Sequence, residues 1–184
     1  MQVRIAILSI GSVNTEILRV IQNGLREAFP RTDCTIREGA MRVPGDAHNP
    51  MRHQYHSTRI LAEMSNYTRE LSADCVLGVI DVDLYVPSLN FVFGEADPRR
   101  GVAVLSVIRL RSGLHEGEDR DRVFERRAAT EAIHELGHTY GLGHCRDPHC
   151  VMWFSNTLAE TDRKGTAFCP AHAAALRAAL RSRR

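Results

Sequence analysis

One histidine-rich segment constrains this chain more than any other part of its sequence: residues 134–144 read HELGHTYGLGH. His134 and His138 are four residues apart, so on a helix they lie one turn apart on the same face and both imidazoles can face one ion. Glu135 follows the first histidine and can reach a water at that ion without binding the metal. This spacing predicts a helix that carries a site for hydrolysis at zinc.

A catalytic zinc site with one open position needs a third protein ligand. His144 lies six residues after His138, too far along the chain to share the face of an unbroken helix. Gly141 can adopt a positive φ at little steric cost, so it can end the helix and turn His144 back toward the metal. The alternative is a surface helix with solvated histidines, and the placing of the glycine and the third histidine argues against it.

Composition excludes several other classes of function. Hydrophobic residues make up 43% of the 184 residues and charged residues 25%, the balance of a globular protein that fits one domain. A formal net charge of +2 is too small to indicate nucleic acid as a partner. No stretch approaches the roughly 20 apolar residues of a membrane span, so we expect no membrane partner, and we expect a monomer. Lys164 is the only lysine, which we interpret as compositional bias toward arginine.

The five cysteines form an odd set, and three of them lie close to the C-terminus at spacings that suit a metal and not a disulfide framework. This usage predicts a reducing, cytoplasmic location. Cys34 and Cys75 lie in apolar runs, where we expect them to be buried small hydrophobic residues.

Hydrophobic periodicity predicts strands and helices that alternate along most of the chain. Strands are predicted at Val3–Ile10, 34–43, Cys75–Ile80, 90–97 and 101–110, with a loop at 44–50. Helices are predicted at 17–28 and 60–71, over the histidine motif, and at 171–180, with irregular chain between Gly141 and the last helix. This order predicts an α+β or α/β domain with a cleft.

The long histidine motif resembles that of the metzincin clan, HExxHxxGxxH, at every fixed position. Within the clan the chain resembles the archaemetzincin family, because Cys145 directly follows the third histidine, Cys150 stands five residues later, and Met152 follows two residues after that. The resemblance implies a methionine turn beneath the metal at Met152; ordinary core filling is the alternative. Some metzincins have a tyrosine ligand where this chain has Phe154, so we expect none here.

The resemblance also implies an architecture. We expect a metzincin-like α+β fold, in which a twisted mixed β-sheet carries backing helices and an active-site helix. The lobe 1–143 would hold the sheet and the active-site helix. The lobe 144–184 would be a small irregular region, stabilised by zinc and ending in a helix. Residues 89–96 are similar to the family segment before the active helix, so substrate backbone is expected to pair with 91–95; an internal hairpin strand is the alternative.

A second zinc site is implied by the same resemblance. The archaemetzincin pattern closes with C-x-x-C, whereas this chain has Cys169 and, in the last position, His172. With Cys145 and Cys150 these residues would form a closed tetrahedral site, since zinc accepts three thiolates and one imidazole. His149 is an alternative fourth ligand, and a three-coordinate site is another possibility.

Together these features predict a zinc metallopeptidase with two zinc ions per chain, one catalytic and one structural. His134, His138 and His144 would hold the catalytic ion, and Glu135 would act as general base and then general acid on a peptide or protein substrate. The alternative from another class is a non-catalytic, zinc-stabilised peptide-binding module.

Overall fold

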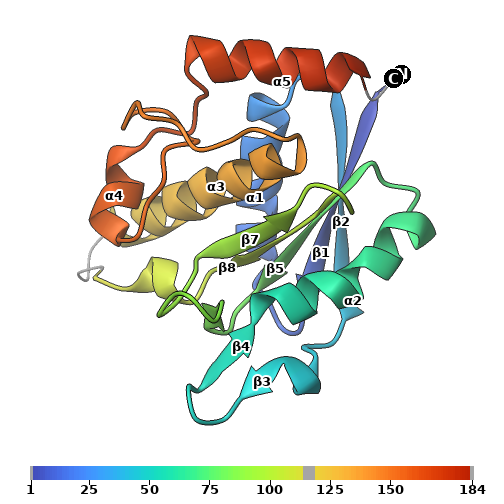
Figure 1. Ribbon diagram of the computed structural model, residues 1–184, viewed down its shortest axis with the longest axis vertical. Coiled ribbons are helices and arrows are strands. Elements are labelled where there is room, and N and C mark those ends of the chain that lie inside the picture. The colour runs from blue at the N-terminus through green and yellow to red at the C-terminus, as the bar shows by residue number, and fades with distance from the viewer. Residues whose placement is uncertain (1, 114–118, 183–184) are drawn as a thin grey trace.

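The structure is a computed structural model that describes residues 2–113 and 119–182. Its central feature is a five-stranded sheet in the order β2-β1-β5-β8-β7 (Figure 1). Four strands are parallel, and β7 runs antiparallel to β8 at one edge. The strands are β1 (Val3–Ile10), β2 (Thr32–Met41), β5 (Cys75–Ile80), β7 (Gly94–Asp97) and β8 (Val102–Ser106).

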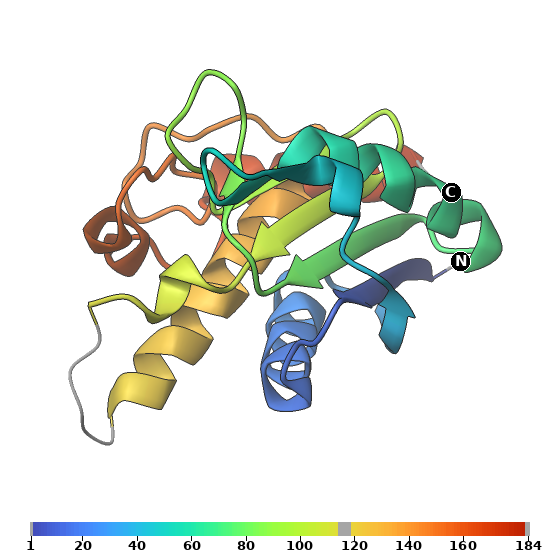
Figure 2. The same ribbon diagram turned by 90° about the horizontal axis from the view of Figure 1, so that it is seen from below.

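Helices cover both faces of this sheet (Figure 2). Helices α1 (Thr15–Ala28) and α3 (Asp119–Thr139) pack on one face, and α2 (Ser57–Glu70) packs on the other. Alternate side chains of β1 pack on the two faces of the sheet, because successive side chains of a strand point in opposite directions. Ile5 and Ile7 join the core beneath α1 and α3, whereas Leu8 joins the core beneath α2.

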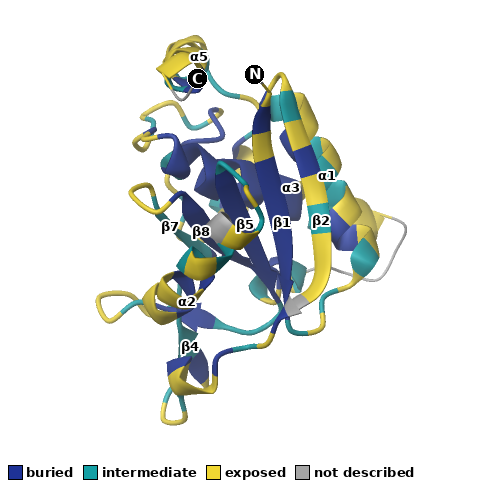
Figure 3. Cartoon of the chain, turned by 90° about the vertical axis from the view of Figure 1, so that its right-hand side faces the viewer, coloured by how far each residue is buried: buried dark blue, intermediate teal, exposed yellow. Residues whose placement is uncertain are grey.

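The central strands are therefore buried on both faces. β5 and β8 are buried along their whole length, while β2 exposes much of its surface at the edge of the sheet (Figure 3). Strands that are covered on both sides have continuous apolar sequences, and this explains why the run Cys75–Ile80 was recognisable without any alternation.

Smaller elements complete the chain. A three-stranded sheet is formed by β3 (His48–Asn49), β4 (Gln54–His56) and β6 (Leu84–Tyr85). Two short 3₁₀ helices are η1 (Gly45–Ala47) and η2 (Arg109–Arg111). After α3 the chain is irregular, apart from α4 (Leu158–Arg163) and α5 (Pro170–Ser182). Helix α5 buries Leu176 and Leu180 in the same core as α1 and α3.

The predicted fold class is confirmed: a mixed sheet carries helices on both faces, and the motif lies on a helix. Three local predictions were wrong. The predicted strand 90–97 is regular only from Gly94, because Val92 forms a bridge with Leu84 and leaves the main sheet. The strand predicted at 101–110 ends at Ser106, before η2. The predicted loop 44–50 contains η1 and the first strand of the small sheet.

Helix α4 was also not expected, although the sequence carries a signal for it. Thr157 and Glu160 form a capping box, in which each side chain accepts a hydrogen bond from the other residue's backbone N–H. The spacing Ser/Thr-x-x-Glu marks a helix start. Among the described residues, no helix combines the length and the apolar character needed to cross a membrane.

Candidate active site

Helix α3 positions His134, Glu135 and His138 on consecutive turns, and the helix stops directly after them. Gly141 has a φ of 78°. Its N–H donates to the carbonyl of His138 at 2.9 Å, and the N–H of Leu142 donates to the carbonyl of Gly137 at 3.3 Å. These two bonds form a Schellman motif, the helix end that favours glycine in the left-handed region. The turn brings His144 back beside the helix, as the sequence predicted.

The three imidazoles meet at one point. Their candidate ligand nitrogens all lie within 4.8 Å of one another. The ring centroids of His134 and His144 are 5.4 Å apart, and those of His138 and His144 are 4.9 Å apart. Two backbone carbonyls orient the helical pair, since Nδ1 of His134 lies 2.8 Å from the Val151 oxygen and Nδ1 of His138 lies 2.7 Å from the Leu142 oxygen.

These contacts suit a metal ion. A carbonyl oxygen only accepts, so Nδ1 of each helical histidine carries the proton and Nε2 keeps its lone pair. The two Nε2 atoms nevertheless face each other at 3.1 Å, close to the separation of about 3.3 Å between two nitrogens bound to tetrahedral zinc. Burial lowers the pKa of His134, His138 and His144, which favours the neutral form that binds metals.

Glu135 lies next to these nitrogens and is almost fully buried. Burial first, and the negative charge of Glu131 second, raise the pKa of Glu135 to about 8. The side chain packs against the backbone of β7, where a Cβ atom on Gly94 would lie 2.5 Å from the Glu135 Cγ atom. Only a glycine leaves room for the carboxylate in this position.

A cleft with a volume of about 230 Å³ opens over the histidines and Glu135. The cleft is also lined by Phe91, by residues of the edge strand β7, and by Glu131 and Ser155. A larger cavity of about 620 Å³ lies between α1 and α3, but none of the predicted metal ligands lines it. The cleft beside the histidines is therefore the one that can bring a substrate to the metal ligands.

Met152 lies in a tight turn against α3. The Trp153 N–H donates to the Cys150 carbonyl at 2.9 Å, and this bond closes the turn. A Cβ atom on Gly137 would lie 2.6 Å from the Met152 sulfur, so the methionine packs directly against the helix between the two histidine turns. The Phe154 ring lies against His144 with a centroid distance of 4.8 Å and an interplanar angle of 52°. Phe154 stands at the position where some metzincins have a tyrosine ligand.

The other predicted metal ligands form a second group. The candidate ligand atoms of Cys145, Cys150, Cys169 and His172 all lie within 4.8 Å of one another. The Cys145 and Cys169 sulfurs are 3.8 Å apart, far beyond a disulfide bond but equal to the separation of about 3.8 Å between two sulfurs bound to tetrahedral zinc. His149 is exposed and is not a member of this group.

The fourth member of the group is well oriented for a metal. Nε2 of His172 lies 3.1 Å from the Gly143 carbonyl oxygen, so Nε2 carries the proton and the free lone pair is on Nδ1. That Nδ1 atom is 3.2 Å from the Cys169 sulfur. Hydrogen bonding, above all from the backbone N–H of His172, lowers the pKa of Cys169 to about 6, toward the thiolate that binds metals.

Comparison with known proteins identifies the chain. The model of peptidase family M54 matches residues 14–178. The chain belongs to peptidase family M54. The archaemetzincin of Pyrococcus furiosus is 37% identical over 169 residues, which cover 90% of this chain and 88% of that protein. The archaemetzincin of Methanocaldococcus jannaschii is 38% identical, with 92% and 90% coverage.

Solved structures agree with this family. The archaemetzincin of Methanopyrus kandleri matches with a TM-score of 0.82 at 32% identity, covering 98% of this chain and 96% of that one. A zinc-dependent peptidase from Methanocorpusculum labreanum matches with a TM-score of 0.83 at 28% identity, covering 94% and 99%. The predicted archaemetzincin resemblance is confirmed, and the chain is a zinc metallopeptidase.

Two buried residues of this archaemetzincin were not recognised in the sequence. Glu131 and Lys164 form an ion pair beside the cleft, and their side chains are 2% and 0% exposed. A signal was present, because Lys164 is the only lysine in the chain. Compositional bias is one explanation for a lone lysine among arginines, and a site that requires a small cationic head group is another.

Replacing Gly94 with alanine should reduce turnover without removing zinc. The added Cβ atom would lie 2.5 Å from the Glu135 Cγ atom and 2.6 Å from the Val104 carbonyl oxygen, so Glu135 must shift. A misplacement of about 1 Å costs on the order of 10²-fold in rate. Peptide hydrolysis, zinc content and melting temperature should be measured together. Gly45→Ala is the matched control, since no atom lies within 4 Å of its Cβ position, and an equal loss of activity there would refute the steric explanation.

Proposed function

We propose that this archaemetzincin hydrolyses peptide bonds at a zinc ion held by His134, His138 and His144, with Glu135 as the residue that transfers protons. The observation that carries this proposal is the approach of two imidazole Nε2 atoms to 3.1 Å, each without a proton to share, beside a buried carboxylate. Such an arrangement is costly in an apolar site unless a cation binds between the nitrogens.

Zinc supplies Lewis acidity when bound, which lowers the pKa of a water and stabilises negative charge on the scissile carbonyl oxygen. Glu135 accepts a proton from the attacking water and passes it to the leaving amine. The carbonyls of Val151 and Leu142 keep Nε2 of the helical histidines free of protons. Burial of Glu135 excludes competing water from its carboxylate.

The substrate backbone is proposed to pair with β7. This strand forms the edge of the main sheet, so one row of its backbone N–H and C=O groups has no strand partner. Residues on both sides of its start, Phe93 and Glu95, line the catalytic cleft. An extended peptide that adds to this edge would pass over Glu135.

We propose that Cys145, Cys150, Cys169 and His172 hold a second, structural zinc ion. The separations between the sulfurs and the nitrogen suit one tetrahedral ion with no open position. The division into lobes 1–143 and 144–184 belongs to this proposal. The second ion would tie α5 to the chain that follows His144, while both lobes share the core beneath α3.

Replacing His172 with alanine should remove one zinc equivalent, whereas His149→Ala should leave two. Nδ1 of His172 is 3.2 Å from the Cys169 sulfur, while His149 lies outside the group of four. Metal analysis of both purified variants checks this expectation. Loss of zinc from His149→Ala alone would reassign the fourth ligand, and two equivalents in both variants would indicate a three-thiolate site.

We also propose a cytoplasmic, monomeric enzyme. The cysteine cluster supports a reducing location, because the Cys145 and Cys169 sulfurs are 3.8 Å apart, which suits two ligands of one metal ion and not a disulfide bond.

A soluble zinc-loaded sample tested against a broad peptide library measures the proposed peptidase activity directly. Peptides that bind without being cleaved would contradict the proposed peptidase activity.

A further inference from the structure

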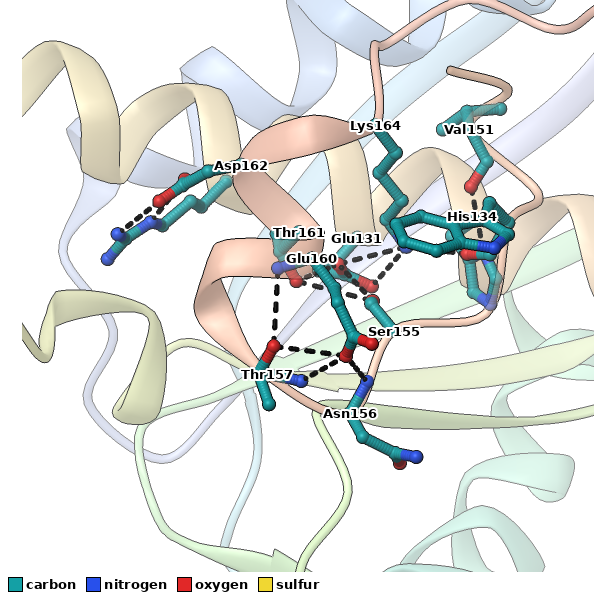
Figure 4. Close-up of polar contacts among 12 residues, drawn as sticks. Glu131, His134, Val151, Ser155, Asn156, Thr157, Glu160, Thr161, Asp162 and Lys164 are labelled. Carbon is teal, nitrogen blue, oxygen red and sulfur yellow. Dashed lines mark hydrogen bonds and ion pairs between the residues drawn. The ribbon is translucent and has the colours of Figure 1, made fainter. Parts of the chain in front are cut away.

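The most deeply buried cation of the described chain lies beside the catalytic cleft. Lys164 is fully buried, and its ammonium nitrogen lies 3.0 Å and 3.1 Å from the two carboxylate oxygens of Glu131 (Figure 4). It also donates to the carbonyl of Trp153 at 3.3 Å. All three ammonium protons therefore have acceptors, which a planar arginine could not match in this geometry.

The acidic partner belongs to the catalytic helix. Glu131 precedes His134 by three residues and Glu135 by four, so it lies one turn earlier on the same face of α3. It lines the cleft together with both of these residues. Its carboxylate also accepts from the hydroxyl groups of Thr161, at 2.8 Å, and Ser155, at 3.3 Å.

The pair also shapes the cleft. The segment 153–164 leaves the turn that holds Met152, contributes Ser155 and Asn156 to the cleft, and returns to α3 through Lys164. We call the segment 153–164 the cleft wall. Lys164, at the C-terminal end of α4, donates to Glu131 of α3 and to the Trp153 carbonyl, so it links both ends of this wall to α3 (Figure 4).

Charge balance is the second consequence of this arrangement. A divalent cation is attracted by a nearby carboxylate and repelled by a nearby ammonium group, and both effects are strong where water is excluded. Both charges lie beside the metal ligands, because Glu131 lines the cleft with His134 and the Lys164 nitrogen contacts both of its carboxylate oxygens. With both partners present, the two effects oppose each other.

We propose that Glu131 and Lys164 are a positioning pair for the catalytic zinc site. The pair fastens the segment 153–164 to α3, and its opposite charges cancel, so that it adds no net charge beside the three histidines. This inference rests on the proposed function, since it requires zinc at those histidines. Removing one partner should change zinc affinity with a sign set by the charge that remains, whereas a merely structural pair would weaken binding whichever partner was lost.

A second ion pair provides a matched comparison. Arg127 lies one turn before Glu131 on α3 and binds Asp162 of the same wall through two bonds of 2.7 Å. It fastens the same two elements, but neither residue lines the cleft. Asp162→Asn therefore weakens an attachment of the segment 153–164 to α3, and the positive charge that it leaves on Arg127 lies outside the cleft.

The test measures zinc affinity by chelator competition on the full chain at pH 8. The zinc equivalent bound at the catalytic site is identified as the one that is missing from a His138→Ala variant. Lys164→Met should bind this zinc about tenfold more tightly, and Glu131→Gln about tenfold more weakly. The double variant Glu131→Gln/Lys164→Met should return to within about threefold of the original affinity, as should Asp162→Asn.

Shifts in the same direction for both single variants, or no shift beyond threefold, would overturn the inference. If a single variant fails to fold, the double variant decides, because a neutral pair that binds zinc about tenfold more weakly is also incompatible with charge balance. Failure of the proposed function is recognised separately: the unmodified chain would then lack a zinc equivalent that depends on His138.

Discussion

Replacing Glu135 with glutamine should reduce peptide hydrolysis by about 10² to 10⁴-fold while the zinc content stays unchanged. The amide keeps the size of the side chain, so its packing against Gly94 is preserved, but it cannot accept the proton of the attacking water. General acid and base catalysis contributes on the order of 10² to 10⁴-fold, and turnover should fall by about this factor. Hydrolysis of a fluorogenic peptide and metal analysis of the same sample measure both quantities.

Glu125→Gln is the matched control for this experiment. Glu125 lies on the same helix but lines the cavity between α1 and α3, away from the catalytic cleft. Its replacement should leave activity and zinc content unchanged. Retained turnover in Glu135→Gln would contradict the assigned role, and loss of zinc from that variant would indicate that Glu135 helps to hold the metal.

Replacing Cys169 with serine should remove one zinc equivalent, lower the melting temperature and reduce hydrolysis at least about tenfold. The effect on activity follows from the chain order, because Cys145 comes directly after His144. The Cys145 N–H also donates to the Met152 carbonyl at 2.8 Å, so the cysteine site and the methionine turn are joined. Loss of the structural ion should therefore displace a catalytic ligand.

A buried cysteine outside the cluster provides the control. Cys34 is 1% exposed in β2, and burial raises the pKa of its thiol to about 11. Cys34→Ala should reduce stability by about 1 kcal/mol and leave two zinc ions and full activity. Two zinc equivalents in Cys169→Ser, or unchanged activity after one is lost, would contradict the coupling between the two sites.

Several features could be predicted from the sequence because they depend on short-range geometry. The spacing of His134 and His138 follows from one helical turn, and the glycine that ends the helix follows from the cost of a positive φ. The buried strands were recognisable from continuous apolar runs. The signal for helix α4 is equally short-range, since its capping box spans only Thr157 to Glu160. Hydrophobic periodicity does not predict this helix, because it has no apolar face.

Other features depend on residues far apart in the chain. Gly94 meets Glu135 only because the edge of the sheet packs against α3, and nothing in the sequence near Gly94 indicates this contact. Lys164 finds its acceptor 33 residues away on α3. A polar residue that is satisfied only by a distant partner looks, in the sequence, like any other surface charge.

Local sequence patterns were sufficient to predict the family, the fold class and the candidate ligands of both metal groups, because metal-binding spacings and helix periodicity are encoded within short segments. Which atoms converge became visible in the folded chain: His172 and not His149 approaches the three cysteines, β7 borders the cleft, and a buried ion pair lies beside the histidines. The convergence of distant side chains depends on how the sheet and helices pack, and the spacing of residues along the chain does not specify that packing.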